Sequence, residues 1–373
     1  MLASSSSRML RLQRTLSKPA LRTYHDLVTT PTNKPVVSHG PPGYSAVSGH
    51  VATVFGCTGF LGRYLVAKLA KMGTQVIIPY RDEDEKRHLK LTGDLGQVVA
   101  MEWDIRNEQQ IAECLRHSDV VYNLVGRNYN TKNFDIADVH VDGAQRIARI
   151  AAEAGVSNLV HVSHLNASAS STSRFYATKA RGEEVVREAF PAATIVRPGP
   201  LYGYEDKFLN NMADWPIWWK LNEGQTKTRP AHVMDVAQAL ANLISKPHLA
   251  GSLLSLPGPS ILTHEYLLHL IDTVTLRPPS GAPIVPKKLA EVISKVAQNV
   301  WWPIVSPDEI ERRYIDDAGT DGSQTEEELL KDWDLVEVHP SEIEAHALTY
   351  LRRFRSAENF PRPLVLPARP AAA

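Results

Sequence analysis

The sequence predicts an α/β fold in which a doubly wound parallel sheet carries helices on both faces. Two observations predict this fold class. Short apolar, β-branched runs alternate with helical segments over residues 51–197, and a glycine-rich turn joins the first run to the first helical segment. The composition agrees, because 43% of the 373 residues are hydrophobic and 22% are charged, as in ordinary globular proteins.

The strands and helices can be placed from their periodicity. Buried runs predict strands at residues 51–55, 75–81, 98–102, 120–125, 158–163 and 193–197. The segments between them predict helices at residues 63–72, 108–116, 138–154 and 175–190. The first strand, turn, helix and second strand together span about 30 residues, which is the length of one βαβ unit.

After residue 200 the alternation weakens, and we expect a smaller C-terminal α/β subdomain with extended tails. One helix is expected at residues 235–245, and a proline-rich stretch at 277–286 separates it from another at 287–300. Short surface helices are expected at 326–335 and 340–354, and an extended tail at 360–373. We therefore expect one domain at 49–280, including the subdomain from about 200, and a C-terminal helical segment and tail at 281–373.

The N-terminal residues have an unusual composition. Residues 1–25 contain basic residues at helical spacing and a serine run, and no acidic residue precedes Asp26. This composition is typical of a mitochondrial transit peptide, the alternative being a basic tail without a targeting role. Residues 26–48 are rich in proline and glycine without periodicity, and we expect an extended arm there.

Charge and cysteine content exclude several protein classes. The 41 basic residues balance 41 acidic residues, so no global basic field favours nucleic acid as a partner. No apolar run reaches about 18 residues, so we expect no membrane-spanning helix. The two cysteines, Cys57 and Cys114, do not make a disulfide framework and indicate a reducing compartment.

The glycine-rich turn predicts a phosphate-binding loop. Gly56, Gly59 and Gly62 lie between the first strand and the first helix. In such a turn glycine permits the tight bend, the approach of the backbone to a pyrophosphate and the packing of helix on strand. The helix N-terminus then offers amides and partial positive charge to the anion. The alternative is a glycine turn without a ligand. We expect the turn to contact a nucleotide through Gly56, Thr58, Gly59, Phe60, Leu61 and Gly62.

The end of the second strand indicates which nucleotide binds. Arg81 lies 19 residues after Gly62, where an NAD-binding protein usually has an acidic residue that accepts from the ribose hydroxyl. A basic residue there suits a 2′-phosphate, while Asp82 is expected to point elsewhere. The sequence therefore favours NADP(H) over NAD(H), unless Arg81 is only a solvated surface residue.

Further motifs resemble the extended and atypical short-chain dehydrogenase/reductase superfamily over about residues 50–260. They are the segments 123–126, 197–203 and 232–237, together with the glycine turn. The resemblance implies a Rossmann-type fold. It also implies that Asp104 and Ile105 lie beside the adenine, and that further cofactor contacts come from Val125, Lys179, Pro198 and Leu201.

The acid–base positions of that superfamily are altered here. Its Y-x-x-x-K motif becomes Phe175 followed by Lys179, and Tyr176 is rotated by about 100° around the helix. Phenylalanine has no proton to transfer. His140 replaces the asparagine of the preceding long helix, and the active serine or threonine falls near residues 165–166, with Ser163 or the run 168–173 as substitutes. We therefore assign no catalytic residue.

Three segments are similar to the Rossmann-fold accessory subunits of mitochondrial respiratory complex I, at residues 159–167, 179–183 and 204–210. This resemblance implies a peripheral protein on the matrix side of the inner membrane. It would contact other complex I subunits near the junction of the peripheral and membrane arms. It would hold NADPH tightly as a structural cofactor, without required turnover. The alternatives are an active NADP-dependent oxidoreductase or epimerase, and a sensor of the nucleotide ratio.

The remaining features allow two interpretations each. Two tryptophan clusters suit a membrane interface or a partner surface, or else they are buried in the subdomain; the tryptophans are Trp215, Trp218, Trp219, Trp301 and Trp302. Lys287, Lys288 and Lys295, near the second cluster, would fit a helix lying on anionic lipid. Cys57 lies in the phosphate loop, where it is a redox sensor or only a small loop residue. His161 and His164 have no third ligand at metal spacing, so we expect no metal site.

Overall fold

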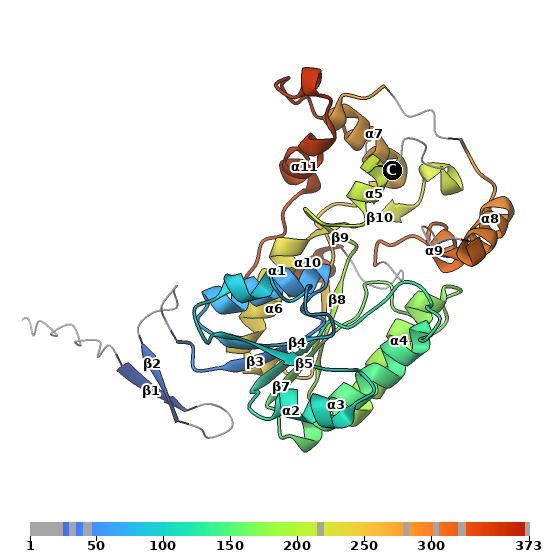
Figure 1. Ribbon diagram of the computed structural model, residues 1–373. Coiled ribbons are helices and arrows are strands. Elements are labelled where there is room, and N and C mark those ends of the chain that lie inside the picture. Colours follow the sequence, from blue (N-terminus) through green and yellow to red (C-terminus); the bar gives the residue numbers. More distant parts are fainter. Residues whose placement is uncertain are drawn as a thin grey trace, which may run out of the picture.

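The computed structural model describes residues 25–29, 35–39, 47–214, 220–278, 283–300, 306–319 and 326–369. All five tryptophans of the two clusters, and residues 1–24 of the expected transit peptide, lie outside these described residues. The described chain has a central sheet with helices on both faces, and a smaller helical body covers one end of it (Figure 1).

The central sheet has seven strands in the order β12-β8-β7-β6-β3-β4-β5, and every neighbouring pair is parallel. The strands are β3 Val51–Phe55, β4 Gln75–Tyr80, β5 Val98–Glu102, β6 Val120–Asn123, β7 Asn158–Val162, β8 Thr194–Pro198 and β12 Leu253–Leu256. From β3 the chain first builds outward to β5 and then returns to β6 on the other side. This reversal is the signature of the doubly wound Rossmann-type sheet, and it confirms the predicted fold class.

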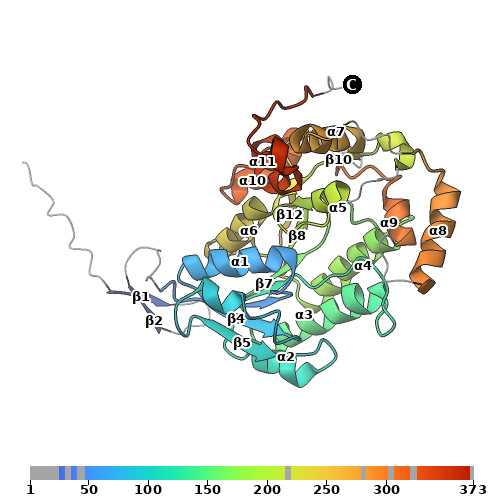
Figure 2. The ribbon, with the colours of Figure 1, turned by 45° about the horizontal axis from the view of Figure 1, so that its top comes forward.

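Helices cover the sheet on both faces (Figures 1 and 2). Helices α1 (Phe60–Lys71) and α6 (Val233–Asn242) pack together on one face, and their buried leucines and valines join the strands in one core. Helices α2 (Glu108–Leu115), α3 (Gly143–Glu153) and α4 (Arg174–Ala189) cover the other face with a second core. The helix expected at 138–154 is a π-helical turn, Asp138–Asp142, followed by α3.

A third core holds the smaller subdomain together. It is formed mainly by α5 (Leu209–Asp214), α7 (His264–Thr275) and α11 (Ile343–Leu351). Two small sheets lie nearby, one pairing β9 (Leu201–Tyr202) with β11 (Ala231–His232) and one pairing β10 (Lys227–Thr228) with β13 (Leu262–Thr263). Short 3₁₀ turns complete the chain at Leu89–Thr92, Leu221–Gly224, Leu243–Ser245, Pro247–Leu249, Arg352–Phe354 and Ala357–Asn359.

The C-terminal helices pack on the body of the protein. They are α8 (Lys287–Val300), α9 (Pro307–Arg312) and α10 (Glu326–Leu335). Helix α10 lies at the surface with Leu335 46% exposed, and it is anchored by Trp333, which is 1% exposed and whose indole donates to the Pro257 carbonyl at 2.8 Å. The C-terminal tail is also anchored, since Arg369 forms ion pairs with Glu342 and Glu344, each at 2.8 Å.

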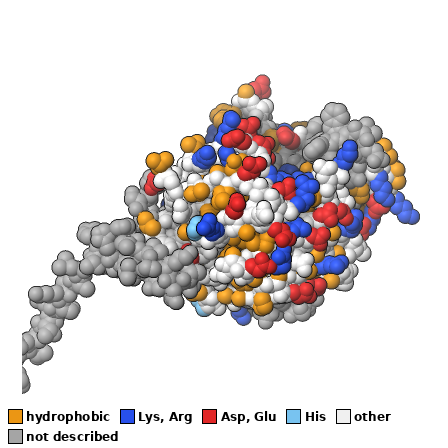
Figure 3. Space-filling view, turned by 60° about the horizontal axis from the view of Figure 1, so that its bottom comes forward, with side chains coloured by type: hydrophobic (Ala, Val, Ile, Leu, Met, Phe, Trp, Pro, Cys, Tyr) orange, Lys and Arg blue, Asp and Glu red, His pale blue; other side chains and the backbone are white. Residues whose placement is uncertain are grey.

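Three further observations concern the arm, the helices and the surface. Within the arm expected to be extended, the described residues form two antiparallel paired strands, β1 (His25–Thr29) and β2 (Pro35–His39). In the described part of the chain, no helix is both long and apolar enough to cross a bilayer. On the face shown in Figure 3, the described basic and acidic side chains are interspersed with one another.

Candidate functional site

The glycine turn after β3 brings the N-terminus of α1 against the strand backbone. Gly56 has a φ of +82°, and a Cβ on it would lie 3.0 Å from the Leu124 carbonyl carbon. A Cβ on Gly62 would collide with the Gly56 carbonyl oxygen, so only glycine lets the helix approach so closely. The amide of Gly59 donates to the same carbonyl at 3.1 Å. The turn therefore presents bare backbone and a helix N-terminus, the arrangement that binds a pyrophosphate.

A cavity of about 460 Å³ opens beside this turn. It lies at the carboxyl edge of the sheet where the strand order reverses between β3 and β6, the position at which this fold binds ligands. We call the part of the cavity that lies against the turn and the strand ends its inner half. Most of the residues predicted from the sequence line this half: Gly56, Gly59, Phe60, Leu61, Gly62, Phe175, Tyr176, Lys179, Pro198 and Leu201.

The first turn of α4 carries the altered acid–base positions. Phe175 is 6% exposed, and the guanidinium of Arg312 lies 4.6 Å from its ring centroid. The rings of His140 and His164 meet it edge-on at 5.4 and 5.6 Å. The position of the missing tyrosine is therefore filled by an aromatic ring enclosed on three sides, and it offers no proton.

Tyr176 is turned toward the C-terminal segment. Its hydroxyl donates to Asp317 at 3.4 Å, and burial, together with that carboxylate, raises the pKa of Tyr176 far above its usual range. Such a phenol holds its proton firmly. Tyr176 lines the cavity, but its hydroxyl is directed to Asp317 and does not take over the role of the missing tyrosine.

Lys179 keeps the position expected of a ribose-binding lysine. Its ammonium donates to the Val162 carbonyl at 3.2 Å, and burial lowers the pKa of Lys179 to about 8. Ser163 is the next residue after Val162 and lines the cavity. Its hydroxyl is buried and has no hydrogen-bond partner in the described structure. Ser163 is thus the hydroxyl best placed among the substitutes weighed from the sequence, whereas Asn166 is engaged by the Asp316 carbonyl at 2.5 Å.

His140 lies behind the cavity wall and does not line the cavity. Its Nε2 accepts from the amide of Arg127 at 3.1 Å, and its Nδ1 lies 3.0 Å from the Thr178 hydroxyl. Burial, with the charge of Lys179 as a second cause, lowers the pKa of His140 to about 2, so the ring is neutral. Its role in this structure is to hold the loop after β6 against α4.

The residues expected at the adenine end lie farther along the same sheet edge. Arg81 and Asp104 follow β4 and β5, and Arg81 is exposed. A hydrogen bond from Arg106, assisted by the charge of Arg81, holds the pKa of Asp104 below its usual value. Ile105 packs against Gly143. Five of the expected nucleotide contacts do not line the cavity: Arg81, Asp104, Ile105, Thr58 and Val125. Their contacts with a nucleotide stay a prediction.

The redox role considered for Cys57 has no support in the structure. The thiol is fully buried and donates to the Pro79 carbonyl at 3.2 Å. Burial raises the pKa of Cys57 to about 12, so almost no reactive thiolate forms at neutral pH. Among the described residues, no group of three or more His, Cys, Asp or Glu side chains could hold a metal ion.

The outer half of the cavity, which sequence reasoning missed, is formed beyond residue 204. Thr228 of β10, Arg312 of α9 and Asp317 reach it from three separate segments. Asp317 lies 3.6 Å from the Nε2 atom of His164, and burial raises the pKa of Asp317 to about 7. The sequence carries no local signal for this grouping, because Asp317 is 141 residues from Tyr176.

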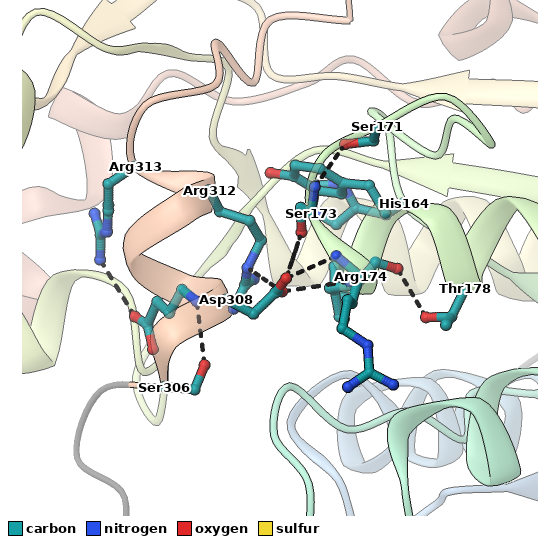
Figure 4. A network of polar contacts seen from close by, with 12 residues as sticks. His164, Ser171, Ser173, Arg174, Thr178, Ser306, Asp308, Arg312 and Arg313 are labelled. Carbon is teal, nitrogen blue, oxygen red and sulfur yellow. Dashed lines mark hydrogen bonds and ion pairs between the residues drawn. The ribbon is translucent and has the colours of Figure 1, made fainter. Parts of the chain in front are cut away.

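Asp308 of α9 caps α4 (Figure 4). Its carboxylate accepts from the amides of Arg174 and Phe175 at 2.7 and 3.3 Å and from the Ser173 hydroxyl at 3.0 Å. Ser173, the residue that begins the helix, makes no capping bond with its own side chain. A carboxylate at a helix N-terminus also matches the helix dipole. The C-terminal segment thereby fixes the helix that carries Phe175 and Lys179.

Comparisons with known proteins agree on fold and relationship. A family model described as NAD(P)H-binding matches residues 56–247. The mitochondrial NADH-ubiquinone oxidoreductase 40 kDa subunit of Neurospora crassa is 44% identical over 336 residues, 90% of this chain and 87% of its own. The mitochondrial NADH dehydrogenase (ubiquinone) 1 alpha subcomplex subunit 9 of Rattus norvegicus is 40% identical over 86% and 85%. A Citrobacter triphenylmethane reductase, 16% identical, shares the fold with a TM-score of 0.61 over 81% of this chain and 99% of its own.

The cap formed by Asp308 predicts a local effect on α4. Asp308→Ala should lower the free energy of unfolding by about 1–2 kcal/mol, the usual cost of a lost N-cap. It should also accelerate hydrogen exchange at the amides of Arg174 and Phe175. Asp135→Ala is the control, because it removes an exposed ion pair to Arg174 at 2.9 Å that contributes little. Unchanged exchange at the two amides in Asp308→Ala would contradict the assignment.

The buried carboxyl of Asp317 predicts a pH dependence. Its pKa is raised from 3.8 to about 7 in the folded protein, so the folded state binds this proton more tightly than the unfolded chain. Stability is therefore lost as pH rises from about 4 to 7. Asp317→Asn should gain on the order of 2 kcal/mol over the wild type between pH 5 and pH 8 in urea denaturation. The exposed neighbour Asp316→Asn should show no such gain, and parallel curves for both variants would refute the burial argument.

Proposed function

This chain belongs to the family of the 40 kDa and alpha-subcomplex-9 subunits of mitochondrial NADH-ubiquinone oxidoreductase, and we propose that it is a non-catalytic accessory subunit of that complex. In this proposal it binds NADPH tightly as a structural cofactor and supports the assembly and stability of the complex. Its partners are other subunits of the complex near the junction of the peripheral and membrane arms. It resides on the matrix side of the inner membrane, and residues 1–25 direct it there.

One observation supports the proposal above all others. The glycine cradle and Lys179 are arranged for a nucleotide, while Phe175 occupies the position of the proton donor. Binding requires only the cradle, whereas turnover requires a group that moves a proton at the reacting atom. The enclosed ring of Phe175 supplies no such group, and Tyr176 is committed to Asp317. This arrangement disfavours the alternative of an active oxidoreductase or epimerase.

The cavity residues fit an NADP nucleotide. Gly59, Leu61 and Gly62 would hold its pyrophosphate at the N-terminus of α1. Lys179 and the unpartnered hydroxyl of Ser163 would bind its ribose and nicotinamide end. The exposed guanidinium of Arg81 is free to reach a 2′-phosphate at the end of β4, which is why we propose NADPH in place of NADH.

A structural role for the nucleotide follows from linkage. A ligand that binds only the folded state stabilises it by about 4 kcal/mol when present at a thousandfold excess over its dissociation constant. The ligand would fix the glycine turn, the loop after β6 and the first turn of α4, which together line the inner half of the cavity. Any surface of the protein that these three segments shape for contact with other subunits would then form only when the nucleotide is bound.

The nucleotide proposal predicts stoichiometric NADPH in the native protein. Acid extraction and mass spectrometry should find about one NADPH per chain after long dialysis. Gly59→Asp should weaken retention at least tenfold by placing a carboxylate against the pyrophosphate, and Arg81→Glu should do so by repelling the 2′-phosphate. The controls are the uncharged isostere Gly59→Asn and Arg87→Glu, whose side chain is 76% exposed.

The two charged variants should also lower the amount of assembled complex, measured on native gels, without changing the chemistry of the complex that forms. Normal assembly with an empty site would refute the structural role. A nucleotide that exchanges freely would instead favour a sensor or an enzyme. In that case Tyr176→Phe tests for turnover, since it removes the phenolic hydroxyl of a tyrosine that lines the cavity.

Helix α8 supports a proposed contact with lipid. Its apolar side chains Leu289, Val292 and Val296 are 52%, 58% and 59% exposed, and Lys288 and Lys295 are exposed on the same helix. An amphipathic helix with these features lies in the headgroup region of an anionic bilayer.

The lipid contact can be tested by flotation of the full chain with vesicles. We expect binding to vesicles containing phosphatidylserine at low salt, and loss of most of it in Val292→Glu. The control is Leu91→Glu, which introduces the same charge at a leucine that is 87% exposed in a 3₁₀ turn. Equal flotation of the two variants, or no binding of the wild type, would exclude this role for α8.

A further inference from the structure

The residues proposed for the dinucleotide leave the outer half of the cavity without an assigned ligand. The residues proposed for the nucleotide come from the glycine turn, the strand ends and Lys179. The outer half continues past the first turn of α4 to Thr228, Arg312, Ile315 and Asp317. These residues come from β10, from α9 and from the segment that follows it, so a separate part of the chain builds this space.

Several buried polar atoms, on side chains that line the outer half, have no hydrogen-bond partner within the described structure. They are Thr228 Oγ1, Asp317 Oδ1, and the Nε and Nη2 atoms of Arg312. Thr228 is 1% exposed and Asp317 is 9% exposed. Leaving such groups unpaired costs about 1–3 kcal/mol each. Because all three side chains border the cavity, a polar ligand there would recover this cost.

The charges around the outer half favour an anion. Three nearby carboxylates are already engaged: Glu205 with Arg63 at 3.2 Å, Glu309 with Arg313 at 3.6 Å, and Asp308 with the amides of α4. A fourth carboxyl, Asp317, has its pKa raised to about 7 by burial and so carries only a partial charge at neutral pH. Arg312 reaches Asp308 only at 3.6 Å. After burial, the charges of Arg312 and Lys179 are the causes that lower the pKa of His164 to about 3. The histidine that faces these cations is therefore neutral, and both cations act on the same space.

We propose that the outer half of the cavity binds a small organic oxyanion, a carboxylate or a phosphate, beside the nucleotide. Arg312 holds the oxyanion, and Thr228 and Asp317 accept or donate hydrogen bonds to a hydroxyl of the same molecule. The guanidinium of Arg312 also covers the ring of Phe175, so the bound oxyanion lies next to the first turn of α4 (Figure 4). The inference rests on the proposed function only in assigning the inner half to the nucleotide.

The test is calorimetric titration of the purified full chain, both loaded with NADPH and free of nucleotide. The probes are inorganic phosphate, malonate and malonamide, which is the uncharged analogue of malonate. We expect at least one anion to bind, and malonamide to bind at least tenfold more weakly than malonate. Tighter binding of malonate than of phosphate would identify a carboxylate ligand, and the reverse order a phosphate.

Variants identify the residues. Arg312→Gln should weaken anion binding about tenfold or more, since a charge-assisted hydrogen bond is lost. Because Arg312 also contacts Asp308, the isosteric Thr228→Val serves as a second variant and should cost about fivefold. Arg174→Gln is the control, since the Arg174 side chain on α4 is 61% exposed and pairs with Asp135.

Three outcomes would overturn the inference: equal binding of malonate and malonamide, unchanged affinity in both Arg312→Gln and Thr228→Val, or no heat from either anion. The nucleotide proposal fails separately, since loss of NADPH is detected by extraction and leaves anion binding to the nucleotide-free chain measurable.

Discussion

The close approach of α1 to the edge between β3 and β6 is the constraint on which the site depends. It exists because neither Gly56 nor Gly62 carries a Cβ, which would lie against the Leu124 backbone in one case and the Gly56 carbonyl in the other. The approach places the N-terminus of α1 at the reversal point of the sheet and seats its buried face on α6. The same contact thus forms the anion cradle and completes one core, so the cradle cannot change without disturbing the packing.

A second constraint acts from the far end of the chain. Helix α4 carries Phe175 and Lys179, yet its N-terminus is capped by Asp308, 134 residues away from Arg174. The helix that holds Asp308 also supplies Arg312 to the cavity and joins α8 through the ion pair between Glu311 and Lys287 at 2.7 Å. A change at the exposed face of α8 therefore has a short, contiguous route to α4. Residues 283–300 and 306–319 consequently belong to the site as much as the glycine turn does.

The sequence predicted the parts of this structure that depend on local pattern. The six strands from β3 to β8, the glycine turn and the displacement of tyrosine by Phe175 each follow from spacing within a few residues. Strand β12 was missed because Leu253–Leu256 is short and becomes a strand only by pairing with β8. Helix α7 was missed, and the burial of Trp333 on α10 was not foreseen. Asp308, Arg312 and Asp317 could not be predicted, since tertiary contact alone brings them to α4.

Retention of a nucleotide site without its proton donor is physically consistent. Binding energy that is the same in ground and transition states tightens the complex and accelerates nothing, so a cradle can persist on its contribution to stability alone. Phe175 removes the transferable proton, and its ring packs against two neutral histidines and the Arg312 guanidinium. The packing around Phe175 therefore stabilises the first turn of α4 and offers no proton donor at this position.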